Sequence, residues 1–199
     1  MKALSKHCKS CDTSKEKLLV FFGSPHFNGN TKKLLNYVMD KLNRNYDFFV
    51  VDSYKIQASP CVDCGYCKKY GRCRINDLNG TFSLLEQVSK IMVATPVYNC
   101  SFPAPLKAIF DRFQVYFNLK SKRINNTTKN VFFLFTCGSY VNRTIIASLL
   151  IQCKYIFKSL NAKISDFSLL DGTDEKNITC DILQKCCNNV VKGLLEKKI

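Results

Sequence analysis

Short apolar runs alternate along this chain with longer segments in which apolar residues recur every three or four positions. The runs predict buried strands, and the recurrence predicts helices that bury one face. Five strands are expected, at residues 18–23, 46–51, 90–95, 131–136 and 163–169. Helices are expected between them, at residues 30–42, 81–88, 103–117 and 143–160, with a last helix that begins at Thr173 or Asp174.

Most of the expected strands are nearly continuous apolar runs, without the alternation of a half-exposed sheet. Such strands are typical of a parallel sheet that helices cover on both faces. Five of them in an α/β chain predict a doubly wound, flavodoxin-like three-layer sandwich with strand order 2-1-3-4-5. We expect a single domain over residues 17–199 and a flexible arm at 1–16, which contains Cys8 and Cys11. Residues 57–77 interrupt the alternation as a cysteine-rich insertion.

Cysteine content and charge indicate the cellular compartment and the kind of binding partner that we expect. The chain has 12 cysteines, and its first residues lack the apolar core of a secretion signal, so we expect reduced thiols and a cytoplasmic protein. The longest apolar run, residues 18–22, is far too short to cross a membrane. The net charge is +15, from 30 Lys and Arg against 15 Asp and Glu. No nucleic-acid-binding motif accompanies this charge, which argues against nucleic acid. The first interpretation is a solvated basic surface without a partner role, and the alternative is a surface that attracts an acidic redox partner such as a ferredoxin.

The segment that follows the first strand has the composition of a phosphate-binding turn. It reads Gly23-Ser24-Pro25-His26-Phe27-Asn28-Gly29-Asn30-Thr31 and opens directly into a helix. Backbone N–H groups and the helix dipole favour an anion there, and Ser24, Asn30 and Thr31 can add side-chain donors. The segment lacks the glycine spacing of a dinucleotide fingerprint and the lysine of a P-loop, which favours a terminal monophosphate. The alternative is an ordinary strand–helix turn.

Two further loops follow the third and fourth strands. The first reads Thr95-Pro96-Val97-Tyr98-Asn99-Cys100-Ser101-Phe102-Pro103, and the second reads Thr136-Cys137-Gly138-Ser139-Tyr140. Right-handed crossovers place the carboxyl ends of all five strands at one edge of the sheet. The three loops therefore converge and predict a pocket for a flat heterocycle that bears a phosphate.

Four cysteines stand within thirteen residues of the insertion. Cys61, Cys64, Cys67 and Cys73 have the spacing C-x2-C-x2-C-x5-C. Runs of four thiolates of this kind hold iron–sulfur clusters. A structural zinc more often takes two C-x2-C pairs with a longer loop between them, and reduced cysteines without metal are the third possibility.

Taken together, these residues resemble the flavodoxin-like NAD(P)H-dependent FMN reductases and, within them, the iron–sulfur flavoproteins. The matching pieces are the Gly23–Thr31 turn, the four cysteines, Thr95-Pro96-Val97-Tyr98 and Lys107-Ala108-Ile109-Phe110-Asp111-Arg112. The resemblance implies that Cys61, Cys64, Cys67 and Cys73 hold a 4Fe–4S cluster. For the FMN phosphate it implies Ser24, His26, Asn28, Gly29, Asn30 and Thr31, and for the ring Pro96, Val97, Tyr98, Asn99, Thr136, Cys137, Gly138 and Tyr140.

The resemblance also implies a homodimer or homotetramer, in which each cluster lies close to the flavin of a neighbouring subunit. The expected function is an FMN-dependent oxidoreductase that relays electrons from NAD(P)H or ferredoxin to a small acceptor. No residue stands out as an acid–base catalyst, so the chemistry is expected on FMN. The alternatives are a cluster-free NAD(P)H-dependent FMN or quinone reductase, a non-enzymatic flavodoxin-like carrier, and a basic nucleic-acid-binding domain with a zinc knot.

Overall fold

The computed structural model describes residues 4–7, 15–118 and 128–196 and has the predicted three-layer α/β architecture. Its six-stranded sheet has the order β1-β3-β2-β4-β5-β6. The strands are β1 (Leu4–His7), β2 (Glu16–Phe22), β3 (Tyr46–Asp52), β4 (Lys90–Pro96), β5 (Lys129–Thr136) and β6 (Ala162–Leu170). The last five are parallel, which confirms the order 2-1-3-4-5 expected for them.

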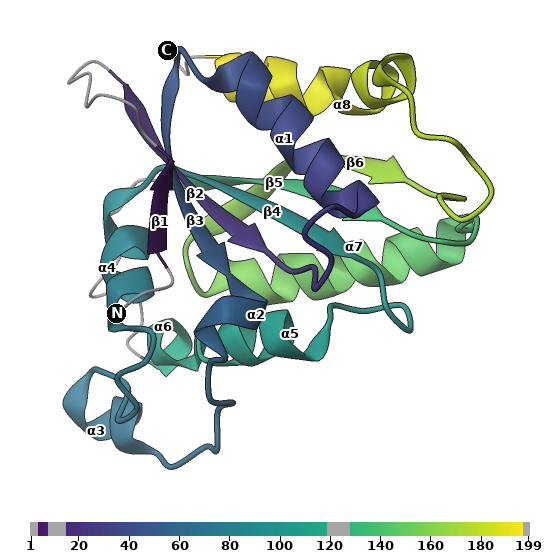
Figure 1. Ribbon diagram of the computed structural model, residues 1–199. Helices are drawn as coiled ribbons and strands as arrows, with labels where there is room; N and C mark the ends of the chain where they lie inside the picture. Colours follow the sequence, from purple (N-terminus) through teal and green to yellow (C-terminus); the bar gives the residue numbers. More distant parts are fainter. Residues whose placement is uncertain (1–3, 8–14, 119–127, 197–199) are drawn as a thin grey trace.

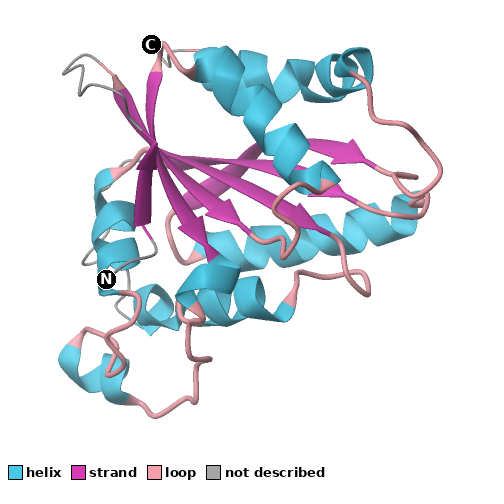
Figure 2. Ribbon diagram, in the orientation of Figure 1, coloured by secondary structure: helices cyan, strands magenta, loops and turns pink. Residues whose placement is uncertain are grey.

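Helices cover both faces of this sheet, as Figures 1 and 2 show. They are α1 (Asn30–Leu42), α2 (Ser53–Ile56), α3 (Tyr66–Tyr70), α4 (Asn79–Gln87), α5 (Ala104–Asp111), α6 (Gln114–Asn118), α7 (Arg143–Lys158) and α8 (Cys180–Leu195). The apolar sides of α1 and α8 share one core with the sheet, and α4, α5 and α7 share the other. Every residue of β4 and β5 is buried, as expected for central strands of a doubly wound sheet. No helix among the described residues has the length and apolar character to cross a bilayer.

The structure differs from the sequence prediction at the N-terminus. Within the segment expected to be a flexible arm, Leu4–His7 form β1, which pairs antiparallel with β3. This strand has little apolar character and joins the sheet by backbone pairing at its edge, so periodicity did not predict it. Cys8 and Cys11 lie outside the described residues.

Two helix boundaries also differ from the prediction. The helix expected at 103–117 is divided into α5 and α6, because the N–H groups of Arg112 and Phe113 bond only three residues back, in a tightened turn. The last helix begins at Cys180, where the Thr179 side chain accepts a hydrogen bond from the Ile182 N–H at 3.5 Å. The caps expected at Thr173 and Asp174 are therefore wrong.

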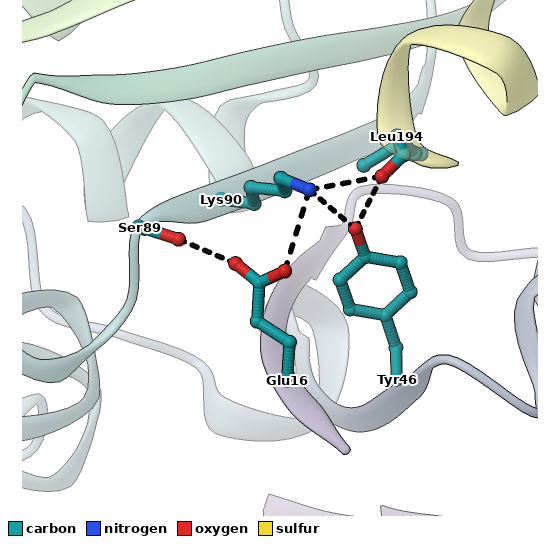
Figure 3. Close-up of polar contacts among 5 residues, drawn as sticks. All are labelled: Glu16, Tyr46, Ser89, Lys90 and Leu194. Atoms are coloured by element: carbon teal, nitrogen blue, oxygen red, sulfur yellow. Dashed lines mark hydrogen bonds and ion pairs between the residues drawn. The ribbon is translucent and has the colours of Figure 1, made fainter. Parts of the chain in front are cut away.

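A network of hydrogen bonds and one ion pair lies at the amino-terminal edge of the sheet (Figure 3). The Lys90 ammonium donates to the Tyr46 hydroxyl at 2.5 Å and to the Leu194 carbonyl at 2.9 Å, and it lies 3.3 Å from Glu16. Glu16 in turn accepts from the Ser89 hydroxyl at 2.6 Å. The network ties the starts of β2, β3 and β4 to the end of α8, at the opposite edge from the candidate site.

Candidate functional site

The three predicted loops meet at the carboxyl edge of the sheet, and Thr136 joins them. Its hydroxyl lies 2.6 Å from the Thr31 hydroxyl at the start of α1, and its carbonyl accepts from the Val97 N–H at 2.8 Å. The three segments that the sequence assigned to one pocket are thus within hydrogen-bonding distance of one another. Their meeting point lies beside β2 and β4, where the strand order reverses and ligands of doubly wound sheets bind.

The loop after β2 is folded so that the first turn of α1 is open to a ligand. The Ser24 side chain is buried and its hydroxyl accepts from the His26 N–H at 3.2 Å, while the Gly29 N–H bonds the His26 carbonyl at 3.2 Å. Helix α1 begins after Gly29, without a side-chain cap and without an acidic residue in its first turn. Its leading N–H groups and its dipole therefore favour an anion.

Two lysines that the sequence reasoning missed lie beside this loop. Lys55 Nζ is 4.2 Å from the centre of the exposed Phe27 ring, and Lys32 Nζ is 6.0 Å from the same ring. Burial lowers the pKa of Lys32, and the nearby Asp52 carboxylate opposes that shift. Their ammonium groups add positive charge next to the open helix end. Lys32 stands in the first turn of α1, but Lys55 is distant in sequence and only the fold brings it near.

The loop after β4 ends in a tight turn that α7 holds. Tyr98 and Ser101 exchange backbone hydrogen bonds of 2.9 Å, and Asn99 and Cys100 between them have φ of 49° and 60°. Gln152 of α7 accepts from the Ser101 hydroxyl at 2.9 Å and donates to the Cys100 carbonyl at 3.2 Å. Two non-glycine residues in the left-handed region cost conformational energy, which these external contacts offset.

Burial divides the predicted ring-binding residues into two groups. Pro96, Val97 and Thr136 are buried, and Cys137 and Gly138 are half-buried. Tyr98, Asn99 and Tyr140 are exposed at the rim. The buried group forms the floor of the candidate site, and the aromatic rings of Tyr98 and Tyr140 lie at its rim, a position from which such side chains can contact a planar ligand.

A fourth loop, residues 171–176, joins the site, and the sequence analysis did not include it. The N–H groups of Gly172, Thr173 and Asp174 bond the carbonyls of residues 139, 137 and 138 at 3.1, 3.1 and 3.2 Å. Lys176 Nζ lies 4.4 Å from the Tyr140 ring centre. The Asp-Gly pair directly after β6 is a turn signature that could have indicated this loop. The same hydrogen bonds explain why Thr173 and Asp174 do not begin a helix.

The four cysteines of the insertion line one pocket. Cys61 and Cys64 are exposed, Cys67 and Cys73 are half-buried, and all four share the pocket with Arg74, Ile75 and Arg112 among others. The volume of this pocket is about 20 Å³, roughly enough for one water molecule. In the described part of the chain, no three His, Cys, Asp or Glu side chains are grouped to hold a metal ion. In Figure 1 the segment, with α3, projects from the body beside α6.

The profile of the family described as NADPH-dependent FMN reductase matches residues 16–161. The chain belongs to this family. The match includes the loops after β2, β4 and β5 and the cysteine segment, and it ends before β6.

Among the relatives of this chain, an iron–sulfur flavoprotein of Archaeoglobus fulgidus is 44% identical to it over 66 residues, which are 33% of each chain. An iron–sulfur flavoprotein of Methanosarcina thermophila is 32% identical over 92 residues, 45% of this chain and 48% of the relative. The match thus spans only about a third to a half of the length of these curated relatives.

Solved structures share the fold. An NAD(P)H:quinone oxidoreductase from Methanothermobacter marburgensis has a TM-score of 0.69 at 12% identity and covers 93% of this chain and 100% of its own. An FMN-dependent NADH-azoreductase from Bacillus anthracis, in complex with FMN, has a TM-score of 0.60 at 13% identity and covers 89% and 96%. At these identities the likeness shows the three-layer architecture alone.

Proposed function

We propose that this protein is an FMN-dependent oxidoreductase that relays electrons from NAD(P)H or ferredoxin to a small acceptor. The observation that carries the proposal is the uncapped N-terminus of α1 at the sheet edge, joined through Thr136 to the loops after β4 and β5. It supports a ligand with a phosphate at one end and a ring at the other. Family membership supports FMN as that ligand.

The residues present fit FMN. The phosphate would be held by the backbone of residues 26–31, the Ser24 hydroxyl and the Asn30 side chain, with Lys32 and Lys55 supplying positive charge nearby. Thr31 is committed to Thr136, so it ties the phosphate loop to the ring-binding loop. The ring would lie between residues 96–99 and 136–140. Bound FMN would link two-electron transfer to one-electron transfer. The chain would orient FMN and tune its reduction potential.

The cysteine segment fits a 4Fe–4S cluster better than a single zinc ion. Zinc–sulfur bonds are about 2.3 Å, so one zinc ion needs its four thiolates close together. A cubane cluster instead binds each thiolate to a different iron, so its four ligands can be farther apart, and the four cysteines line a common pocket. The pocket is small, so a cluster would open the loop as it binds. Cys61 and Cys64 lie on the exposed side, where the loop can move without disturbing the core.

The resemblance to iron–sulfur flavoproteins supports a second copy of the chain as a partner. The cysteine segment projects from the body of the domain (Figure 1), so an adjacent subunit could approach it. The basic charge of the chain, +15, supports an acidic protein such as ferredoxin as an electron donor.

Analysis of anaerobically purified protein tests the proposal. We expect one FMN per chain, together with iron and acid-labile sulfide in equal amounts. Cys64→Ser should remove the iron and sulfide and leave FMN bound, because a ligand is lost only at the cysteine pocket. Cys180→Ser, at an exposed cysteine of α8 outside this pocket, is the matched control and should keep both cofactors.

The outcomes separate the candidate functions. Bound FMN with no iron, together with rapid flavin reduction by NADPH, would identify the cluster-free reductase. Zinc in place of iron, without FMN, would refute the proposal at both sites. FMN that NADPH does not reduce, but reduced ferredoxin does, would assign the electron donor.

A further inference from the structure

Arg112 is a buried cation that holds the cysteine segment to the domain. Its side chain is 1% exposed, at the tightened turn between α5 and α6. The guanidinium donates to the Ser59 carbonyl at 2.9 Å and to the Ile75 carbonyl at 2.7 Å, and it lies 3.0 Å from the Asp77 carboxylate. These partners flank the four cysteines on both sides, so Arg112 fixes the two ends of the segment at one point.

One nitrogen of this guanidinium is left without a partner among the described residues. Arginine has five N–H donors in a rigid plane, and the terminal nitrogens of Arg112 make the contacts just described. The remaining Nε–H is buried and has no hydrogen-bond partner among the described residues. Native proteins rarely leave a buried donor unpaired, so each such group calls for an explanation, such as an ion or other group that occupies the site.

The residue that carries the unpaired donor lines the same pocket as the four cysteines. Arg112 lines that pocket together with Cys61, Cys64, Cys67 and Cys73. Anionic sulfur is an acceptor for an N–H group, and hydrogen bonds to cluster sulfurs are one of the factors that set a cluster's reduction potential. We propose that Arg112 Nε donates to a sulfur of the cluster that these cysteines hold, and that Arg112 thereby positions the segment and raises the cluster's reduction potential.

This inference rests on the cluster assigned in the proposed function. On reduction one electron enters the cluster, no covalent bond forms or breaks, and the proton stays on Nε. A fixed positive charge and a donor both stabilise the more negative, reduced state. Asp77 neutralises part of the charge, but its side chain is 26% exposed, so water screens it.

Two variants separate the hydrogen bond from the charge. Arg112→Lys keeps a positive charge and removes the Nε donor. Arg74→Gln removes a positive charge from an exposed residue of the same pocket and keeps the Nε donor. The measurement is a potentiometric titration, under anaerobic conditions, of the electron paramagnetic resonance signal of the reduced cluster.

We expect Arg112→Lys to lower the ratio of reduced to oxidised cluster about tenfold at the wild-type midpoint, a shift of about 59 mV for one electron. Arg74→Gln should shift the midpoint by much less, because its charge is already screened by water. Equal midpoints for wild type and Arg112→Lys, with the cluster intact, would overturn the inference and leave the proposed function in place. Absence of iron and sulfide from the wild-type protein would overturn both.

A second measurement covers the case in which Arg112→Lys does not assemble. Wild-type protein labelled with 15N-arginine should show a 15N coupling to the reduced cluster in pulsed electron paramagnetic resonance. Arg74→Gln, labelled in the same way, should retain that coupling. A wild-type spectrum without 15N coupling would place the Arg112 donor away from the cluster and refute the inference.

Discussion

Gly23 lies where the core sets the position of the loop after β2, which we propose binds the FMN phosphate. It follows β2 directly, and its N–H bonds the Ala94 carbonyl at 2.9 Å. A Cβ built at Gly23 would lie 2.6 Å from Leu106 Cδ2 and 2.9 Å from Thr95 Oγ1, closer than such atoms approach. Leu106 and Thr95 are both fully buried, so neither can turn into solvent. Gly23→Ala should therefore force Ser24 and the rest of the loop outward.

The magnitude follows from overpacking. A methyl group forced into a filled core typically costs about 1–3 kcal/mol, and we expect this loss in the urea unfolding free energy of Gly23→Ala. Leu106→Ala alone should cost about 2–5 kcal/mol through the cavity that it leaves. In the double variant the new methyl occupies part of that cavity, so its loss should be about 1 kcal/mol smaller than the sum of the single losses. Thr95 still crowds the methyl group, so the rescue is partial.

The same variants report on the site through FMN titration, followed by the change in flavin fluorescence. Gly23→Ala should weaken FMN binding about tenfold, equivalent to about 1.4 kcal/mol, and the double variant should regain part of that affinity. Stability losses that add within about 0.5 kcal/mol would show that the two side chains do not compete for space. If Gly23→Ala bound FMN with wild-type affinity, the core contact would not control the position of the loop, and the reasoning would be refuted.

Two further predictions concern the turn beside the flavin site and the amino-terminal edge. Gln152→Ala should weaken FMN binding several-fold, because the turn loses two hydrogen bonds of roughly 1 kcal/mol each. Gln152→Glu keeps only the acceptor for Ser101, so its FMN affinity should be intermediate. Equal FMN affinities for wild type and both variants would contradict this prediction. Burial raises the pKa of Tyr46 above its ordinary value of about 10. The stability that the neutral Tyr46 phenol contributes is therefore complete below about pH 10 and is lost as the pH rises through the folded-state pKa. Urea unfolding between pH 8.5 and 11 should show a steeper loss for wild type than for Tyr46→Phe, and parallel losses would exclude this role for the phenol.

Sequence periodicity was sufficient for the central part of the fold. Helix α1 spans the predicted residues 30–42, because its apolar positions fall on one side and Gly29 precedes it. Four of the parallel strands, β2 to β5, follow from apolar runs that a doubly covered sheet buries, whereas β6 at the border alternates between polar and apolar residues. Convergence of the three loops then followed from topology, since parallel strands joined by right-handed crossovers share one carboxyl edge.

The features that were not predicted depend on contacts between distant residues. Nothing local in the sequence indicates that Arg112 reaches Ser59 and Ile75, and the turn that divides α5 from α6 occurs at this residue. The 171–176 loop bonds to the loop after β5 through backbone groups, which leave no mark in composition. Gln152 belongs to the predicted helix at 143–160, and nothing in the helical pattern indicates that its amide holds the turn at Cys100.

Strand β1 has a consequence for how this chain behaves when it is shortened. Its backbone covers the outer side of β3. A fragment that starts at residue 15 would leave the Tyr46–Asp52 strand with a row of unpaired amide and carbonyl groups, to which another molecule can add a strand. The other border strand, β6, carries exposed Lys163 and half-buried Asp166, whose charges discourage such addition. We therefore expect trimming or tagging at the N-terminus to promote self-association, and changes at β6 to be tolerated better.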